Sequence, residues 1–302
     1  MKLCETFVAL PARLSDLSRS GGCATAINIY HMKTLIFLIF LAFIFTSYSQ
    51  TWDEIPGVKE IEGLSDNELI ERVRKCRPAD LCDALDAMGI INRGTMTHTM
   101  RPIRPGISFA GFAYTVKFVP ASEPAKICES PDEYFEELGK WTSRVYGYEG
   151  GLENGGALNK VVVMDMSGQA AGVWGSHNGI RWTYNEGLAG IVLDGSIRDT
   201  YEANMEGIKA FCTMRTFNHP YHRVELADVN IPIQCGGVQV HPGDIITADD
   251  DGVLVIPREH IAKVLYLAEI ILDRDQQARA KSYKDAGLEP DETLGPYKDD
   301  AR

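Results

Sequence analysis

The sequence has few cysteines, and their spacing does not suggest a scaffold. Two of the seven, Cys4 and Cys23, fall within the first 31 residues, and no two of the seven form a CxxC pair. A disulfide framework or a structural zinc site is therefore not expected. The five that remain allow one incidental disulfide in an oxidising compartment. Internal repeats and low-complexity blocks are absent as well.

Basic charge is also scarce. The chain carries 30 Lys and Arg against 42 Asp and Glu, a formal net charge of −12, and its acidic residues are dispersed. Proteins that bind nucleic acid present basic stripes to the phosphates, so no nucleic-acid partner is expected.

Long apolar runs are missing too. The run from Leu35 to Phe45 has 11 residues, whereas a helix that spans a bilayer needs about 20. Lys33 precedes the run and small polar residues follow it, the layout of a secretory signal peptide over residues 32–49. An uncleaved membrane anchor is the alternative. Cleavage predicts a periplasmic or secreted protein with no membrane contact.

The segment before Met32 fits no targeting pattern. It has no clear amphipathic period, and a signal peptide normally starts at its own methionine, so residues 1–31 are predicted to be a non-native leader. The mature chain then begins near Gln50, and its roughly 250 residues suffice for one large domain with a sizeable core.

Hydrophobic patterning predicts an α/β domain over residues 77–286. A helical segment precedes it at 50–76, where Ser65 and Glu68 form a capping box, a long helix closes it at 258–286, and a tail follows at 287–302. The strands expected between the helices are largely continuous and apolar, which favours a sheet covered on both faces. They are Ile107–Pro120, Lys160–Met166, Ile191–Leu193, Val238–Val240, Asp244–Ala248 and Val253–Ile256.

Residues 121–159 are the least regular part of the pattern. Their aromatic residues lie among glycines, as in a loop that covers a site. Trp141, Tyr146 and Tyr148 of this segment, together with Trp174, are candidates for stacking on sugar faces, and ordinary packing is the alternative for each.

Polar residues follow one of the predicted strands in "AGIVLDGSIRD". The apolar run Ile191–Leu193 ends at a turn expected at Asp194-Gly195, and Arg198 and Asp199 come directly after. Open α/β sheets place ligands at the carboxyl ends of their strands. Arg binds a carboxylate with two parallel hydrogen bonds, and Asp is an oxygen ligand suited to Mg²⁺. The alternative is an Arg198–Asp199 pair at a surface turn.

A glycine-rich turn follows a second predicted strand. "VVVMDMSG" brings Asp165 to a strand end, and "QAAGVWGSHNG" then places Gly175, Ser176 and His177 before an expected helix. Backbone N–H groups at such a position can hold an anion. A plain turn is the alternative.

Several segments together resemble the RraA-like / 4-hydroxy-4-methyl-2-oxoglutarate (HMG/CHA) aldolase family, in order from about Arg77 to Ala286. They are "RPADLCDALDAMG", "RPIRPGISFAGFAYTV", "VVVMDMSG…AAGVWGS", "GLAGIVLDGSIRD" and "PIQCGGVQVHPGDIITADDDGVLVIP". The resemblance implies a swivelling α/β/β layered fold and a homotrimer with its sites between subunits. It also implies Mg²⁺ (or Mn²⁺) held at Asp199, the substrate bound by Arg198, and a carboxylate held by the amides of the Gly175-Ser176 turn.

One position departs from the family pattern. The family aldolases carry an acidic residue 21 positions before this arginine, and counting back from Arg198 reaches His177. Alignment on Trp174-Gly175 places Ser176 or His177 there, and in either case the carboxylate is missing. An imidazole is well suited to proton transfer near neutral pH, so His177 is a catalytic candidate. The alternative is a histidine that only hydrogen-bonds the turn. His219 and His222 are weaker candidates.

We therefore expect a divalent-metal-dependent lyase acting on a small acidic substrate or an acidic oligosaccharide. Export favours a carbohydrate-derived acid, uronic or unsaturated uronic, and a histidine in place of a carboxylate favours dehydration, which breaks a carbon–oxygen bond. One alternative is an aldolase that releases pyruvate from a 4-hydroxy-2-oxo acid. The other is a non-catalytic RraA-type ribonuclease regulator.

Overall fold

The computed structural model describes residues 51–91 and 93–295. All of these residues except Thr51 belong to one compact unit, which begins at Trp52. The predicted leader at 1–31 and the predicted signal peptide at 32–49 lie outside the described residues, as does the end of the predicted tail, 296–302. No helix within the described ranges is both long enough and apolar enough to cross a bilayer.

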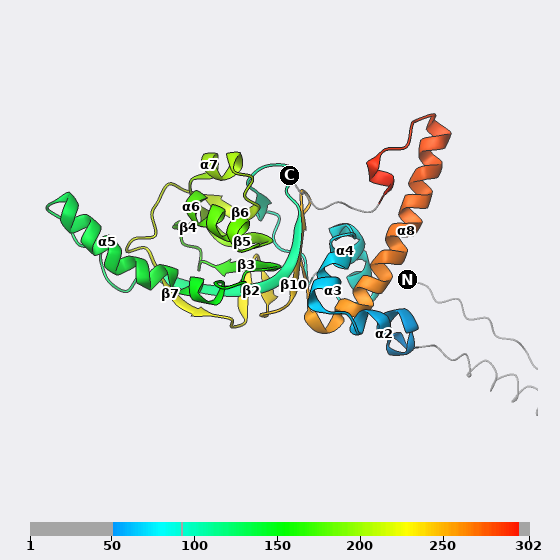
Figure 1. Cartoon of the computed structure of the whole chain (residues 1–302), viewed down its shortest axis with the longest axis horizontal. Helices are drawn as coiled ribbons and strands as arrows, with labels where there is room; N and C mark the ends of the chain where they lie inside the picture. Colours follow the sequence, from blue (N-terminus) through cyan, green and yellow to red (C-terminus); the bar gives the residue numbers. More distant parts are fainter. Residues whose placement is uncertain (1–50, 92, 296–302) are drawn as a thin grey trace, which may run out of the picture. The chain divides into compact units, whose positions relative to one another are not determined.

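A mixed sheet forms the centre of the fold (Figure 1). Its strands run in the order β1-β6-β5-β3-β2-β10-β11, with β4 added beside β5 and β7 beside β2. The two ends of this order meet, because β1 lies against β11 and the side chain of Arg101 donates to the carbonyls of Asp250 and Asp251. The sheet is therefore nearly closed, like a barrel. The strands are β1 (Arg101–Pro102), β2 (Phe109–Pro120), β3 (Lys160–Asp165), β4 (Gly172–Trp174), β5 (Gly190–Ile197), β6 (Ala210–Arg215), β7 (Val224–Val229), β10 (Ile245–Asp249) and β11 (Gly252–Ile256).

The central strands are parallel and buried, as their continuous apolar sequence predicts. β3 pairs in parallel with β2 on one side and with β5 on the other, and Val161, Val162 and Val163 are all 0% exposed. The α/β class is confirmed, as are helical segments at both ends of the described chain. Five strands were not predicted: β1, β4, β6, β7 and β8 (Ile233–Cys235). The strand β8 forms a separate hairpin with β9 (Val238–Val240), which was predicted.

The turn expected at Asp194-Gly195 is wrong. β5 continues through both residues to Ile197, and its pairing with β6 shifts register between Leu193 and Ser196. A β-bulge of this kind takes up an extra residue and bends the strand without ending it. The Asp194 carboxylate accepts the backbone N–H of Gly236 at 2.8 Å, so it ties the β8–β9 hairpin to the sheet.

Helices from both ends of the described chain pack together against one side of the sheet (Figure 1). The predicted capping box is confirmed: Ser65 Oγ accepts the N–H of Glu68, and the Glu68 carboxylate accepts the N–H of Ser65 at 2.9 Å. The helices here are α2 (Pro56–Glu62), α3 (Asp66–Val73), α4 (Pro78–Ala87) and α8 (Ile261–Ala286). Their apolar faces form a second core with β10 and β11.

The irregular structure expected for residues 121–159 is also wrong. This segment contains the 15-residue helix α5 (Pro131–Val145), followed by the 3-10 helix η2 (Tyr146–Gly151). Ser130 caps α5 by accepting the N–H of Glu133 at 3.2 Å, and Pro131 occupies its first turn. Figure 1 shows α5 at the end of the sheet remote from α8. We call residues 121–159 the insert.

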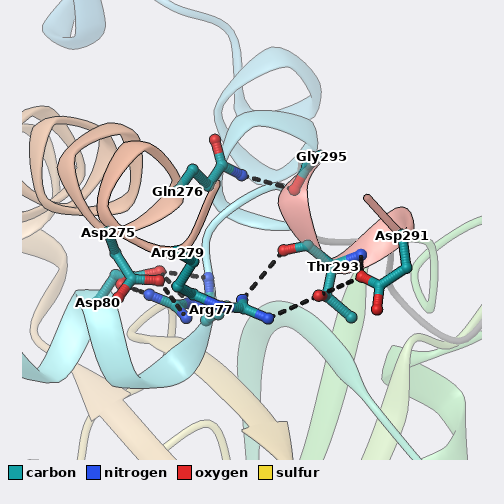
Figure 2. A network of polar contacts seen from close by, with 8 residues as sticks. All are labelled: Arg77, Asp80, Asp275, Gln276, Arg279, Asp291, Thr293 and Gly295. Carbon is teal, nitrogen blue, oxygen red and sulfur yellow. Dashed lines mark hydrogen bonds and ion pairs between the residues drawn. The ribbon is translucent and has the colours of Figure 1, made fainter. Parts of the chain in front are cut away.

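The first part of the predicted tail turns back along α8 (Figure 2). Gln276 and Arg279 of α8 donate to the carbonyls of Gly295 and Thr293, at 2.6 and 3.1 Å. At the neighbouring turn of α8, Asp275 pairs with Arg77 at 2.9 Å. This network anchors residues 293–295 against the C-terminal half of α8.

Candidate functional site

The strand β5 delivers Arg198 and Asp199 to the edge of the sheet. Asp199 adopts the left-handed backbone conformation (φ 54°) and caps the short helix α7 (Thr200–Met205), whose Ala203 N–H bonds its carbonyl at 2.9 Å. Asp tolerates this conformation better than most residues, and non-glycine residues held in it cluster at functional sites. Arg198 Nε donates to Asp199 Oδ1 at 3.1 Å, so the ion pair offered as the alternative to a binding site is present.

The predicted glycine turn packs directly on this pair. A Cβ atom on Gly172 would lie 2.6 Å from Arg198 Cβ, and one on Gly175 would lie 2.5 Å from Asp199 Oδ2. The small size of these glycines lets the β4 turn approach both side chains. The pair is thus enclosed on one side, unlike an ion pair on an open surface.

A cavity of about 380 Å³ opens at this point. Arg198, Asp199, Gly175 and His177 all line it, so the structure brings together four of the five residues that the sequence placed in the site. The fifth, Ser176, is not among the lining residues, and its hydroxyl donates to Glu206 at 2.8 Å. It can serve a ligand only through its backbone. The expected helix after the turn is short: α6 covers Ser176–Ile180.

The insert supplies another part of the cavity lining. Thr142 of α5 and Tyr146 and Glu149 of η2 line the cavity, which agrees with the expectation that this segment covers a site. Burial raises the pKa of Tyr146 to about 12, with Glu149 adding to this effect and the neighbouring Arg198 opposing it. The phenol therefore keeps its proton near neutral pH and can donate a hydrogen bond.

Glu149 is the second carboxylate of the cavity, and the sequence did not identify it. Its side chain is 17% exposed, and it accepts hydrogen bonds from Arg181 Nη1 at 3.0 Å and Trp182 Nε1 at 3.4 Å. Burial raises its pKa, although both bonds lower it. Arg181, from the π-helix η3 (Arg181–Asn185), also lines the cavity. The only signal in the sequence was the charge of these residues.

The three candidate histidines are in different surroundings. His177 lines the cavity and is exposed, whereas His219 lines it and is half-buried. His219 Nδ1 accepts the N–H of Tyr221 at 3.1 Å, so its neutral ring carries the proton on Nε2. Burial lowers the pKa of His219, and Arg198 and Arg223 lower it further. His222 is not among the cavity residues and stacks on Trp141 at 4.2 Å between ring centroids.

The remaining candidates have structural contacts. Asp165 is 7% exposed, pairs with Lys117 at 2.5 Å and caps the N–H of Ser167, so it supports the end of β3. Trp141, Tyr148 and Trp174 are buried within the core, which supports packing over sugar stacking for these three.

The donor set fits a largely hydrated divalent cation. Within residues 51–91 and 93–295, no group of three or more His, Cys, Asp or Glu is arranged to hold a metal ion. Mg²⁺ does not require such a cage, since it keeps several waters and binds through one or two carboxylates. Asp199, whose side chain is 40% exposed beside the cavity, supplies one.

A family model described as "RraA-like: Aldolase/RraA" matches residues 78–255. Protein DlpA of Legionella pneumophila is 28% identical over 72% of this chain and 32% of its own length. A putative 4-hydroxy-4-methyl-2-oxoglutarate aldolase of Halalkalibacterium halodurans is 33% identical over 41% of this chain and 59% of its own. The chain thus spans about a third of the first relative and under two thirds of the second.

Solved structures give the same picture of the fold. A structure described as one of several novel cellulases from gut-associated microbes is 28% identical, with a TM-score of 0.57 over 71% of this chain and 88% of that one. Streptomyces coelicolor RraAS2 is described as an unusual member of the RNase ES inhibitor RraA protein family. It is 24% identical, with a TM-score of 0.57 over 71% of this chain and 97% of that one.

Proposed function

The chain belongs to the RraA-like family, and we propose that it is a divalent-metal-dependent lyase acting on a small carboxylic acid. Lyase chemistry is what the aldolase names of its curated relatives support. The observation that carries the proposal is the cavity, where Arg198, Asp199 and two histidines meet at the glycine turn.

Arg198 is the group for the substrate carboxylate. Only its Nε is bound to Asp199, and within the described part of the chain neither terminal nitrogen has an acceptor, so both remain for a ligand. A guanidinium presents two parallel N–H groups to a carboxylate, which fixes the orientation of the acid as well as its position.

Asp199 is the group for the cation. When bound there, Mg²⁺ or Mn²⁺ would supply positive charge that stabilises an enolate developing beside the carboxylate. Gly172 and Gly175 hold the two side chains in place by their close approach. The protonated Tyr146 can donate a hydrogen bond to the same negative charge from the insert.

We place dehydration ahead of aldol cleavage. Dehydration requires a group that takes a proton from carbon and another that gives a proton to the departing oxygen. His177 lies on the cavity wall and can serve as one of them near neutral pH. One solved relative is described as a cellulase, which supports a carbohydrate-derived acid, uronic or unsaturated uronic, as the substrate.

Aldol cleavage is the second candidate, because several curated relatives are named 4-hydroxy-4-methyl-2-oxoglutarate aldolases. The same pocket would then bind a 4-hydroxy-2-oxo acid and release pyruvate. Export, a homotrimeric assembly and the absence of nucleic-acid binding remain part of the proposal. A ribonuclease regulator would need no substrate in this cavity.

Product analysis tests the proposal. The protein is incubated with Mg²⁺ and either 4-hydroxy-4-methyl-2-oxoglutarate or an unsaturated uronate, and the mixtures are analysed by mass spectrometry. Loss of one water from the uronate supports dehydration, and release of pyruvate supports aldol cleavage. If wild-type protein turns over neither these acids nor their saturated counterparts, the enzyme proposal fails and the regulator becomes the better account.

A further inference from the structure

We propose that Glu149, a carboxylate carried into the cavity by the insert, is the general base of the reaction. This inference rests on the proposed function and adds a catalytic residue to it. Two carboxylates line the cavity, Asp199 directly after β5 and Glu149 in η2 of the insert. The sequence motif accounts for Asp199 alone.

The surroundings of the two carboxylates differ in a way that separates their roles. Asp199 is the more exposed, at 40%, and bonds Arg198 through one oxygen, which suits a ligand for a hydrated cation. Glu149 is 17% exposed and is held at both oxygens, by Trp182 Nε1 and Arg181 Nη1. A carboxylate fixed in this way can face a substrate without binding a cation.

Arg181 bonds two carboxylates, Glu149 and Glu153, and this arrangement affects the pKa of Glu149. Arg181 Nη1 bonds Glu149 at 3.0 Å and Arg181 Nη2 bonds Glu153 at 2.8 Å. Two carboxylates on one guanidinium leave an excess negative charge at this wall. Burial raises the pKa of Glu149 and the charge of Glu153 adds to the effect, while Trp182, Arg181 and His177 oppose it. The groups that face Glu149 are Arg181, Trp182, Glu153, His177, Tyr146 and Tyr148.

A glutamate whose pKa is raised is a stronger base than an ordinary glutamate. In dehydration, Glu149 takes the proton from the carbon beside the carboxylate, and the electron pair of that C–H bond forms the carbon–carbon double bond. The carbon–oxygen bond breaks with its electrons on oxygen, and protonated His177 gives that oxygen a proton, so water leaves. The protein ends with Glu149 protonated and His177 neutral, and proton exchange with solvent restores both.

The same base serves aldol cleavage. There Glu149 takes the proton of the 4-hydroxyl group, and the oxygen forms a carbonyl with C4 as the C3–C4 bond breaks. The electrons of that bond form the pyruvate enolate, and protonated His177 gives a proton to C3. The inference therefore does not depend on which of the two bonds is broken.

The test compares Glu149→Gln, Glu149→Asp and Glu153→Gln with wild type on whichever acid wild type turns over. Glu149→Gln removes the base, so kcat should fall about 10²- to 10⁴-fold, with KM changed less than about threefold because Arg198 still binds the acid. The low-pH limb of the kcat profile, where the base becomes protonated, should disappear. Glu149→Asp should restore the limb with a lower kcat, which separates lost chemistry from lost folding.

Glu153→Gln should change the pH dependence of kcat, which would not happen if Glu149 had a purely structural role. It leaves Arg181 wholly on Glu149, so the pKa of Glu149 should fall and the low-pH limb should move to lower pH, with little change in maximal kcat. Glu136→Gln is the matched control: Glu136 pairs with Lys140 on the exposed face of α5 and should leave both quantities unchanged. Infrared difference spectra of wild type against Glu149→Gln should show one carboxyl that titrates above the ordinary range.

Three outcomes would overturn the inference. They are a Glu149→Gln variant within about threefold of wild-type kcat, a low-pH limb that survives in that variant, and no carboxyl in the infrared spectra that titrates above the ordinary range. If wild type is active, each of these outcomes contradicts the base role of Glu149 and leaves the proposed function standing. A wild-type protein that turns over none of the acids defeats the proposed function and the base role together.

Discussion

Gly175 leaves no room for a side chain beside Asp199: a Cβ on the glycine would lie 2.5 Å from Asp199 Oδ2. The backbone of Gly175 is extended (φ −152°), a conformation open to any residue. The glycine is therefore required at this position by the carboxylate it faces, and the turn holds Asp199 Oδ2 within a narrow range of positions.

Gly175→Ala should displace the Asp199 carboxylate and leave the fold intact, because the end of an Asp side chain can rotate away. A misplacement on the order of 1 Å can cost about 10²-fold in rate, so activity should fall by roughly that factor. Mn²⁺ affinity should fall as well, because the displaced carboxylate is the group that binds the cation. Steady-state kinetics and calorimetric titration with Mn²⁺ measure the two effects.

Gly139→Ala is the control for this change, since nothing beyond the neighbouring residues and backbone of α5 itself lies within 4 Å of its Cβ position. Alanine in a helix is favoured over glycine by about 0.5–1 kcal/mol, so this variant should be slightly more stable and fully active. Equal activity losses in both variants would mean that the Gly175–Asp199 contact is irrelevant.

Arg198→Lys should keep the positive charge and lose the planar pair of N–H groups. A charged contact of this kind is worth about 2–4 kcal/mol, so kcat/KM should fall roughly 30- to 1000-fold. A change below about threefold would place Arg198 outside the substrate site. Circular dichroism of the variant checks that the fold is unchanged.

Much of this site follows from local sequence. Arg198 and Asp199 were predicted because they directly follow an apolar strand, and the glycine turn because its residues are adjacent in the chain. The Ser65 capping box was predictable for the same reason. The continuation of β5 through Asp194-Gly195 was not, because a bulge depends on the partner strand β6.

Glu149 and Arg181 are 32 residues apart, and nothing local pairs them. The helix α5 had a usable signal in Ser130-Pro131, an N-cap followed by proline in the first turn, which the nearby glycines and aromatics outweighed. The role of the insert as a cavity wall depends on tertiary packing alone.

His219 should titrate below the ordinary range of histidines, because burial and the charges of Arg198 and Arg223 lower its pKa. The pKa of His219 is then higher in the unfolded chain than in the folded protein. At pH values between these two pKa values, the unfolded chain binds more protons than the folded protein. His219 should therefore add stability above its unfolded pKa and lose that contribution as the pH falls through its folded value.

Two measurements check this behaviour. NMR titration identifies the His219 resonance by its absence in His219→Gln, and urea unfolding at several pH values follows the stability. Wild type should lose more stability than the variant on acidification through this window. A resonance that titrates above about 6.5 would contradict the expected direction.

His177→Ala should lower the rate by roughly 10²- to 10⁴-fold and remove one limb of the pH–rate profile if this residue transfers a proton. His177→Asn distinguishes this role from a structural one, since an amide keeps a hydrogen bond and does not titrate near neutrality. A nearly fully active Asn variant would mean that His177 only shapes the turn. His219 would then be the next residue to test.

The central claim, that the cavity beside Arg198 and Asp199 is the active site of a metal-dependent lyase, is tested most directly by turnover of wild type and Asp199→Asn before and after chelation. We predict that wild type forms product with Mg²⁺, stops when the metal is removed and recovers when Mg²⁺ or Mn²⁺ is restored. Asp199→Asn should remain folded and inactive throughout. Full activity of chelated wild type, or of Asp199→Asn, would contradict the account.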